Sequence, residues 1–340
     1  MVKMSHRAAI FVLLLLSLTI WTACERVAKR ETDPLAGRFE GTVVPQGGKP
    51  VKAEAWAIAD ENNKYRVAIV YPAAAAKPIR IELLGRSNGS EIAILAKDWD
   101  RKPLDQPWSG TITKDTLHIV ATGAKGGKAE MKRVEQRQSP TLGEKPPAGA
   151  VVLLPFEEGK TTNLDQWTND EWPCEPDGSI QVYRGHNRTK QEFGSFKLHV
   201  EFYVPFLPTL RGQARGISGI YLHNRYEICI IDSFGMILGD HSCGAISGQL
   251  APAVDVALPP GQWQTFDINF KAPQFDKAND AQVRGAIITV LMNGVKIHDA
   301  MAIGHVSGGA IGLPNKTGPL RLQDHGDPVR FRNMWLVEEK

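Results

Sequence analysis

The segment FKLHVEFY, residues 196–203, decides the fold class of the C-terminal half of this chain. Its apolar side chains, at Leu198, Val200 and Phe202, alternate with three more polar ones. Alternation with a period of two predicts a β-strand that buries one face and turns the other towards water or a ligand.

Similar short runs continue to the end of the chain, and no long segment of helical periodicity interrupts them. Asn293-Gly294 between two of the runs is typical of a two-residue hairpin turn. We therefore predict that residues 151–340 form a two-sheet jelly roll. The further runs lie at 219–222, 226–231, 263–270, 285–292, 295–298, 310–313, 320–323 and 329–337.

Residues 36–138 repeat the strand-and-turn pattern on a smaller scale, which predicts an antiparallel meander, either closed or sandwiched. Its tryptophans, Trp56, Trp99 and Trp108, are either core residues or a platform for sugar. Residues 139–150, SPTLGEKPPAGA, contain adjacent prolines and predict a semi-extended linker. The predicted fold is thus all-β, with a small antiparallel β domain before the jelly roll.

Residues 1–24 have the plan of a secretory signal peptide, with Lys3 and Arg7 before an apolar run that is short for a membrane span. Ala23 before Cys24 resembles a bacterial lipobox, although Trp21 stands where that pattern usually has leucine. Plain cleavage and release is the alternative to lipidation at Cys24. The polar residues 25–35 predict a tether. We expect an exported protein of the periplasm or outer membrane, which meets the membrane through a lipid anchor only.

The composition excludes nucleic acid as a partner, because 40 basic residues face 37 acidic ones without a basic stripe interleaved with aromatic residues. If Cys24 is lipidated, the remaining cysteines are odd in number, so at least one is a free thiol or pairs between chains. They are Cys174, Cys229 and Cys243. Cys229 and Cys243 are candidates for a disulfide, and the alternative is that Cys229 is a buried thiol within a strand.

Several stretches of the second domain resemble the 3-keto-disaccharide hydrolase family, whose fold is like that of concanavalin A. They are residues 193–194 (FG) with 198–202 (LHVEF), 213–222 (QARGISGIYL), 226–235 (YEICIIDSFG), 243–246 (CGAI) with 248–252 (GQLAP), 318–326 (GPLRLQDHG) and 329–333 (VRFRN). Two positions depart from the family pattern: Ile217 replaces the usual Asn and Cys229 replaces the usual Gln. If the usual residues contact sugar, these replacements imply an altered substrate or a reduced activity.

The resemblance implies a 3-keto-sugar as the partner, namely a glycoside whose C3 hydroxyl has been oxidised to a ketone. The ketone acidifies the proton on C2, so that a base can remove it and the C1 substituent can leave before water adds. Such a hydrolase, or lyase and hydratase, needs a general base, a group that stabilises the enolate and an acid for the leaving group. It does not need the paired carboxylates of an ordinary glycosidase.

Glu227 is the first candidate for the base, because a carboxylate within an apolar strand must face water, a ligand or a partner. It shares its strand parity with Cys229, which suggests a polar concave face; a structural salt bridge is the alternative. Asp232 has the opposite parity and joins Glu227 only through a bulge or a strand end. A turn cap is the alternative role for Asp232.

Gln323, Asp324 and His325 form the sharpest polar cluster, before Gly326 at the end of a strand. His325 is the second candidate base, and neighbouring carboxylate and imidazole groups can orient one another in a catalytic or metal-binding pair. A network that locks a loop is the alternative for this cluster.

The remaining candidates would bind substrate. Arg215 offers a positive fork for an enolate or for sugar hydroxyls, with a salt bridge to Asp232 or Asp240 as its alternative. His223 ends a strand, where it is an acid, a base, a metal ligand or merely solvated. The resemblance adds Tyr221 and Gln249, and Glu201 with His199 could reach the same cleft from the strand at 196–203.

No zinc motif such as Cys-x-x-Cys or His-Glu-x-x-His occurs in the sequence. A single divalent ion held by Glu, Asp and His side chains would stabilise an enolate, and the sequence leaves its presence open. Ile217 and Cys229 favour an alternative function, that of a non-catalytic, lectin-like module that binds carbohydrate. A third hypothesis is a structural envelope protein, which predicts a large exposed apolar patch and no polar cleft.

Overall fold

The computed structural model describes residues 32–45, 47–73, 77–98, 107–121, 127–135 and 138–339. The predictions for the signal peptide, for Cys24, for most of the tether and for Trp99 therefore lie outside the described residues. The two parts of the described chain are both built of antiparallel strands, so the predicted all-β fold is confirmed. Among the described residues, no helix is long and apolar enough to cross a membrane.

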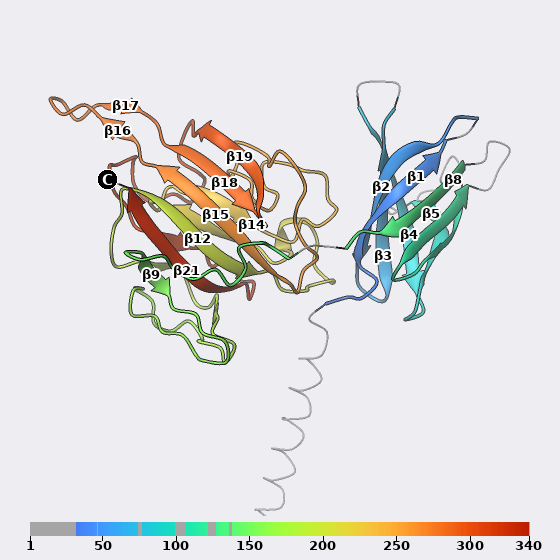
Figure 1. The fold of residues 1–340 in the computed structure, drawn as a ribbon, viewed down its shortest axis with the longest axis horizontal. Coiled ribbons are helices and arrows are strands. Elements are labelled where there is room, and N and C mark those ends of the chain that lie inside the picture. The colour runs from blue at the N-terminus through green and yellow to red at the C-terminus, as the bar shows by residue number, and fades with distance from the viewer. Residues whose placement is uncertain are drawn as a thin grey trace, which may run out of the picture.

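The first part is a closed barrel in which each strand pairs with the next and β1 pairs with β8 (Figure 1). Its interior is filled with apolar side chains, among them Phe39 and Trp108 beside the small inward residues Ala53, Ala55 and Ala57 of β2. Trp108 is thus a core residue, whereas Trp56 belongs to a separate cluster with Phe234 of the second part. The strands are β1 (Gly37–Val44), β2 (Val51–Ala59), β3 (Lys64–Tyr71), β4 (Ile79–Ser87), β5 (Ile92–Asp98), β6 (Trp108–Ile112), β7 (Thr116–Ala121) and β8 (Gly127–Arg133).

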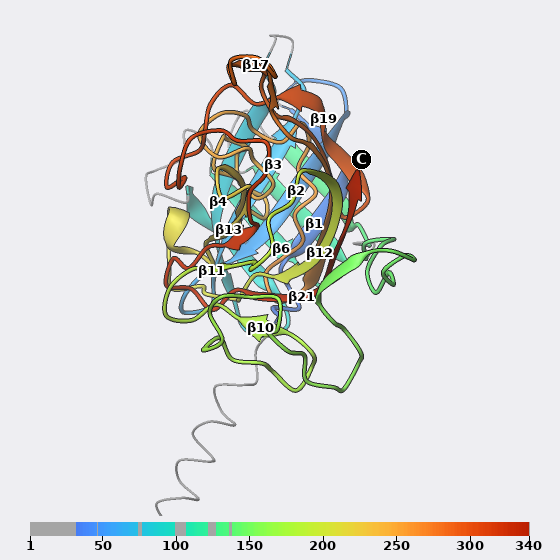
Figure 2. The same cartoon turned by 90° about the vertical axis from the view of Figure 1, so that its left-hand side faces the viewer.

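The second part is a sandwich of a seven-stranded and a four-stranded sheet (Figure 2). The larger sheet runs in the order β10-β21-β12-β15-β18-β19, with β9 also paired to β21. It comprises β9 (Val151–Leu154), β10 (Ile180–Gln181), β12 (Ser195–Tyr203), β15 (Trp263–Lys271), β18 (Ile287–Met292), β19 (Val295–Ala302) and β21 (Arg330–Glu339). The smaller sheet runs β11 (Asn187–Arg188), β20 (Arg321–Leu322), β13 (Ser218–Leu222) and β14 (Tyr226–Ile230).

Alternation explains how the two sheets meet. The apolar residues of β12, such as Leu198 and Val200, face Ile220 and Ile228 of the smaller sheet in one continuous core. A short ribbon of β16 (Gln274–Phe275) and β17 (Gln282–Arg284) and the 3-10 turn η1 (Gly212–Ala214) complete the elements. The hairpin predicted at Asn293-Gly294 is present, with φ of 51° and 77° between β18 and β19.

The strand predicted at residues 310–313 is wrong, because these residues form a loop. Gly309 and Gly312 have φ of 72° and 86°, which an extended strand does not permit. The backbone amide of Ile311 instead donates to the carbonyl of Asn224 at 3.0 Å. The loop passes over the smaller sheet, with the side chains of Ile311 and Leu313 exposed.

Candidate active site

The outward face of the four-stranded sheet carries a row of polar side chains. Register places Tyr221 directly opposite both Glu227 of β14 and Arg321 of β20, so these side chains share one face. Their neighbours Ile220, Ile228 and Leu322 alternate to the other face and join the core. The sequence therefore builds the site with the same period of two that builds the fold.

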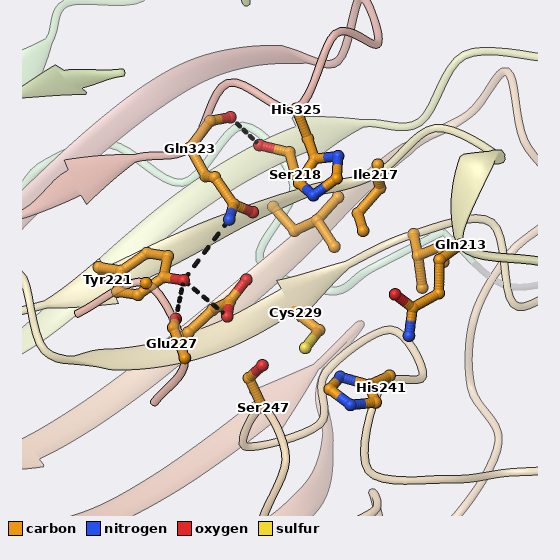
Figure 3. A pocket seen from close by; sticks show the side chains of 14 residues that line it. Gln213, Ile217, Ser218, Tyr221, Glu227, Cys229, His241, Ser247, Gln323 and His325 are labelled. Atoms are coloured by element: carbon orange, nitrogen blue, oxygen red, sulfur yellow. Dashed lines mark hydrogen bonds between the residues drawn. The ribbon is translucent and has the colours of Figure 1, made fainter. Parts of the chain in front are cut away.

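A cavity of about 310 Å³ lies over this face. It brings together Tyr221, Glu227, Gln323 and His325 from the sequence-predicted site residues (Figure 3). Gln213 and His241 lie across the cavity from Glu227 in this view. The rest of the lining consists of Ile217, Ser218, Cys229, Ile230, Ile231, Ser247, Gly308 and Gly309.

Glu227 lies within the cavity wall and is 6 % exposed. The Tyr221 hydroxyl lies 2.9 Å from Glu227 Oε2 and 2.6 Å from the carbonyl of Gly308, so two acceptors share its one hydrogen, and Ser247 also hydrogen-bonds the carboxylate. Burial raises the pKa of Glu227 above its ordinary value, and these contacts offset it only in part. A carboxylate with a raised pKa that faces a cavity is a stronger base than an ordinary one, which suits it to accept and return a proton.

Gly219 makes room for this carboxylate. It lies opposite Cys229 in the register, and a Cβ added at Gly219 would overlap the Glu227 side chain. Any other residue would push the carboxylate away from its present position.

Arg321 stands behind Tyr221 and was not singled out by the sequence analysis. Its guanidinium lies 3.8 Å from the centre of the Tyr221 ring and donates from Nη2 to the carbonyl of Gly309 at 2.7 Å. It is 2 % exposed, and Nε and Nη1 have no hydrogen-bond partner. A buried cation beside Tyr221 provides positive potential near Glu227. The sequence does contain one indication of this role: Arg321 stands between Leu320 and Leu322, and a charged residue buried in an apolar strand needs a partner.

The opposite wall comes from two loops. Gln213 and Ile217 belong to the segment before β13, and His241 belongs to the segment after β14, which also supplies Ser247 beside Glu227. His241 was missed because nothing in its surrounding sequence alternates. His325 follows β20 and completes the wall at the upper edge of Figure 3.

The two departures from the family pattern, Ile217 and Cys229, both line the cavity. Cys229 is a free thiol, as are Cys174 and Cys243, so the second of the two alternatives for Cys229 holds. Burial raises the pKa of the Cys229 thiol, which keeps it protonated.

Arg215 and Asp232 lie outside the cavity lining and pair with each other. Arg215 Nη2 is 2.6 Å from Asp232 Oδ2, and Asp232 is 8 % exposed. The backbone amide of Asp232 also donates to the carbonyl of Arg215 at 2.9 Å. The salt-bridge alternative thus holds for Arg215, with Asp232 as its partner. Asp232 also accepts a hydrogen bond from the amide of Phe234 at 3.4 Å, as its turn-cap alternative expects.

Three other predicted residues hold backbone. The fully buried His223 hydrogen-bonds through Nε2 to the carbonyl of Gly194 at 2.8 Å, and burial lowers its pKa to about 4. Asp324 accepts hydrogen bonds from the amides of Gly185 and Gly326 at 2.6 and 2.8 Å. Gln249 donates to the carbonyl of His305 at 2.9 Å. Each of these contacts fixes a loop by bonding its backbone.

Glu201 and His199 face away from the cavity, on the outer side of the larger sheet. Glu201 accepts from Arg332 Nε, Asn333 Nδ2 and the amide of Gly143 at 2.7, 2.8 and 2.6 Å. Residues 139–144 of the predicted linker therefore lie docked on this sheet. The expected approach of Glu201 to the cleft fails because β12 belongs to the other layer of the sandwich.

His199 is ion-paired on this same outer side. Its Nδ1 lies 2.7 Å from Asp267 Oδ1, and its Nε2 lies 3.8 Å from Glu201 Oε1. Burial alone would lower the pKa of His199, but the contacts with Asp267 and Glu201 outweigh it and raise the pKa to about 9.

Within the described residues, the group that comes close enough to hold a metal ion is Glu144, His199 and Asp267. It lies under the linker rather than at the cavity. Because the imidazole already bonds Asp267 and sits against Glu201, we interpret this group as a lock on the linker.

Residues 150–337 match the family model of the 3-keto-alpha-glucoside-1,2-lyase-like domain. No curated protein matches the chain. A crystal structure of a candidate glycosyl hydrolase from Parabacteroides distasonis is 32% identical, with a TM-score of 0.50, and the match covers 57% of this chain and 86% of that one. A second candidate glycosyl hydrolase from the same organism is 24% identical, with a TM-score of 0.40, over 56% of this chain and 99% of that one.

Proposed function

The chain belongs to the 3-keto-alpha-glucoside-1,2-lyase-like domain family, and on this premise we propose that it cleaves 3-keto-glycosides by elimination. A carbohydrate-active role agrees with the related candidate glycosyl hydrolases. The proposal concerns the specific reaction and the side chains that perform it.

In the proposed reaction, Glu227 removes the proton from C2 of the sugar. The electron pair of that C–H bond forms the C2–C3 double bond of an enolate, whose charge rests on the C3 oxygen. The enolate then expels the C1 substituent, which takes a proton from an acid, and leaves a 1,2-unsaturated 3-ketone. Addition of water across that double bond puts hydroxyl on C1 and hydrogen on C2, which completes hydrolysis.

One observation carries the proposal: Glu227 is a buried carboxylate of raised pKa in the wall of a polar cavity, and its direct partners are the neutral hydroxyls of Tyr221 and Ser247. A carboxylate neutralised by an adjacent guanidinium would be a poor base. His325 and His241 are the candidates for the acid, because both line the cavity and an imidazole can donate a proton to a leaving group. Gln323 can hold a sugar hydroxyl, and Arg321 favours the negative charge that develops on the enolate.

The direct test is turnover by purified residues 24–340 with Cys24 replaced by Ser. The protein is incubated with 3-keto-trehalose, 3-keto-lactose and a 3-keto-aryl glucoside, with and without EDTA, and release of the aglycone is followed. We expect release by the wild-type site and its loss in Glu227→Gln. Exchange of the C2 hydrogen with deuterated solvent reports the first step separately, so a protein without exchange and without release contradicts the proposal. A loss of activity in EDTA would add a metal ion to the mechanism.

The rival function is a lectin-like module that binds the same sugars without cleaving them. Ile217 and Cys229 favour it, because they place apolar groups at two positions of the cavity wall. Saturable binding of 3-keto-sugars without exchange at C2 would establish this function. Asparagine at 217 together with glutamine at 229 then tests whether the usual residues restore turnover.

We also propose export and anchoring through a lipid on Cys24. Radioactive palmitate should label the full-length protein in a bacterial host, and Cys24→Ser should abolish the label. Equal labelling of both proteins would refute the anchor.

A further inference from the structure

The wall of the cavity opposite Glu227 is held by the barrel. This wall contains Gln213 and Ile217 from the loop of residues 205–217, and His241 from the segment of residues 231–249. We refer to the two as the first and the second wall loop. Both make side-chain contacts with strands β2 to β4 of the barrel.

The first wall loop meets the end of β2. The guanidinium of Arg211 forms a two-pronged ion pair with Asp60, with Nη2 to Oδ2 at 2.7 Å, and the Asp60 side chain is 2 % exposed. Arg215 Nη2 donates to the carbonyl of Ala59 at 3.4 Å. Phe206 of the same loop packs against the barrel core.

The second wall loop meets the outer faces of the same strands. Phe234 is 2 % exposed and forms an apolar cluster with Trp56, Ile58 and Ala68. Arg80 Nη2 donates to the carbonyl of Gly235 at 2.6 Å, and Arg66 donates to the sulfur of Met236 at 3.2 Å. Glu82 pairs with both arginines and fixes their direction.

Gly235 makes this contact close. Its φ is 66°, and a Cβ added there would lie 2.7 Å from the Cβ of Trp56 and 2.9 Å from Ile58 Cδ1. Alanine at this position would therefore strain the backbone and force the loop away from the barrel.

Short contacts connect these anchors to the cavity. The ion pair of Arg215 with Asp232 at 2.6 Å joins the two wall loops. Ser233 Oγ accepts a hydrogen bond from the amide of Cys243 at 3.0 Å, and the amide of Gly248 donates to the carbonyl of Asp240 at 3.0 Å. His241 stands in the chain between Asp240 and Cys243, which make these two bonds. The position of His241 therefore depends on the position of residues 233–235.

We infer that the barrel is a positioning element of the sugar site, which sets the distance between Glu227 and the opposite wall. Arg80 and Trp56 are positioning residues in this sense, since they act through Gly235 and Phe234 and do not line the cavity. The inference extends the proposed function, and its kinetic readout rests on that function. It predicts that damage to the contact weakens substrate binding without removing the base.

The test compares Arg80→Ala and Gly235→Ala with the matched control Arg86→Ala, an exposed arginine on the same strand β4. KM and kcat are measured on a 3-keto-glycoside, and hydrogen exchange is measured on peptides from both wall loops and from β13 and β14. We expect KM to rise at least about fivefold in Arg80→Ala with kcat changed less, and more in Gly235→Ala. Backbone amide hydrogen exchange should accelerate in the two wall loops and stay unchanged in β13 and β14.

Two results overturn the inference. One is exchange in both variants that matches Arg86→Ala, and the other is faster exchange with an unchanged KM. If the wild-type protein neither turns over nor binds the sugars, the proposed function fails. Exchange in the wall loops then decides the positioning role by itself, because it needs no substrate.

Discussion

Two buried glutamates, one on each sheet, have opposite electrostatic properties. Burial alone would raise the pKa of Glu201, but contacts from His199, Asn333, Gly143 and Arg332 outweigh it and lower the pKa to about 2. Glu227 is almost as buried, has mainly hydroxyl partners, and its pKa is raised. Burial is therefore no guide to role until the partners are counted. The carboxylate of Glu201 is surrounded by hydrogen-bond donors, so its role is structural. The carboxylate of Glu227 has fewer donors and can still exchange a proton with a ligand.

The largest expected effect is on turnover. Glu227→Gln should lower kcat by about 10²- to 10⁴-fold, which is the usual contribution of a general base. The same change should leave the free energy of unfolding unchanged or higher at neutral pH, because it removes a buried charge. Glu201→Gln is the control and should retain most of the activity. A Glu227→Gln protein that keeps more than about a tenth of kcat would exclude Glu227 as the base.

The second effect is on stability. Glu201→Gln should lower the free energy of unfolding by about 3 kcal/mol, since it leaves Arg332 and His199 without their shared carboxylate. Urea denaturation of the two glutamine variants side by side provides the measurement. Equal urea midpoints for Glu201→Gln and Glu227→Gln would contradict a structural role for Glu201 that Glu227 does not share.

The pH dependence of stability should follow the titration of Glu201 and of its neighbour His199. The pKa of His199 is raised from 6.5 to about 9, so its contribution is complete below 6.5 and is lost as pH rises through 9. The pKa of Glu201 is lowered from 4.5 to about 2, so its contribution is complete above 4.5 and is lost as pH falls through 2. The stabilising contributions of His199 and Glu201 are therefore both complete between pH 4.5 and pH 6.5.

Thermal unfolding from pH 5 to pH 10 should therefore show a midpoint that declines above about pH 6.5. His199→Gln should flatten that decline relative to the wild type, after allowance for its lower overall stability. A parallel decline in both proteins would assign the effect to other groups.

The smallest effect concerns the space around Glu227. Gly219→Ala should reduce kcat by about tenfold, because the new methyl group displaces the carboxylate. Gly143→Ala, on the linker that Glu201 binds, is the counterpart. Its φ of 77° strains an alanine, so the variant should lose stability, but no heavy atom lies within 4 Å of the new methyl group and kcat should stay unchanged. Similar kinetics in both variants would show that the position of Glu227 tolerates the methyl group.

The sequence predicts which side chains share one face of a strand, but it does not predict in which sheet of the sandwich that strand lies. Alternation correctly placed Glu227 and Cys229 on one polar face, and it treated Glu201 on β12 in the same way. Only the packing of the sandwich shows that the face with Glu201 is covered by the linker, while the face with Glu227 opens into a cavity. The docking of Gly143 on Glu201 is a contact between residues 58 positions apart, which no local pattern encodes.

The wall loops were predictable only in part. Ile217 was recognised through the resemblance, whereas His241 depends on contacts that residues 233–235 make with the barrel. The sequence points to Arg215 as a substrate-binding residue and offers a salt bridge to Asp232 or Asp240 only as the alternative. The burial of Arg215 against Asp232, outside the cavity, follows from where the first wall loop meets the end of β2.

The position of β21 has a consequence for the order in which the two parts can fold. Each barrel strand pairs with its neighbour in sequence, and the ring closes when β8 reaches β1, so residues up to 133 are sufficient. The last strand of the chain, in contrast, pairs with β9, β10 and β12, and the larger sheet has no complete centre before it arrives. Contacts of such long sequence separation form slowly. Because Asn333 and Trp335 of β21 also bind the carbonyl of Glu144, the linker docks in the same late step. A chain that emerges from its N-terminus would thus have a finished barrel available before the cavity around Glu227 exists.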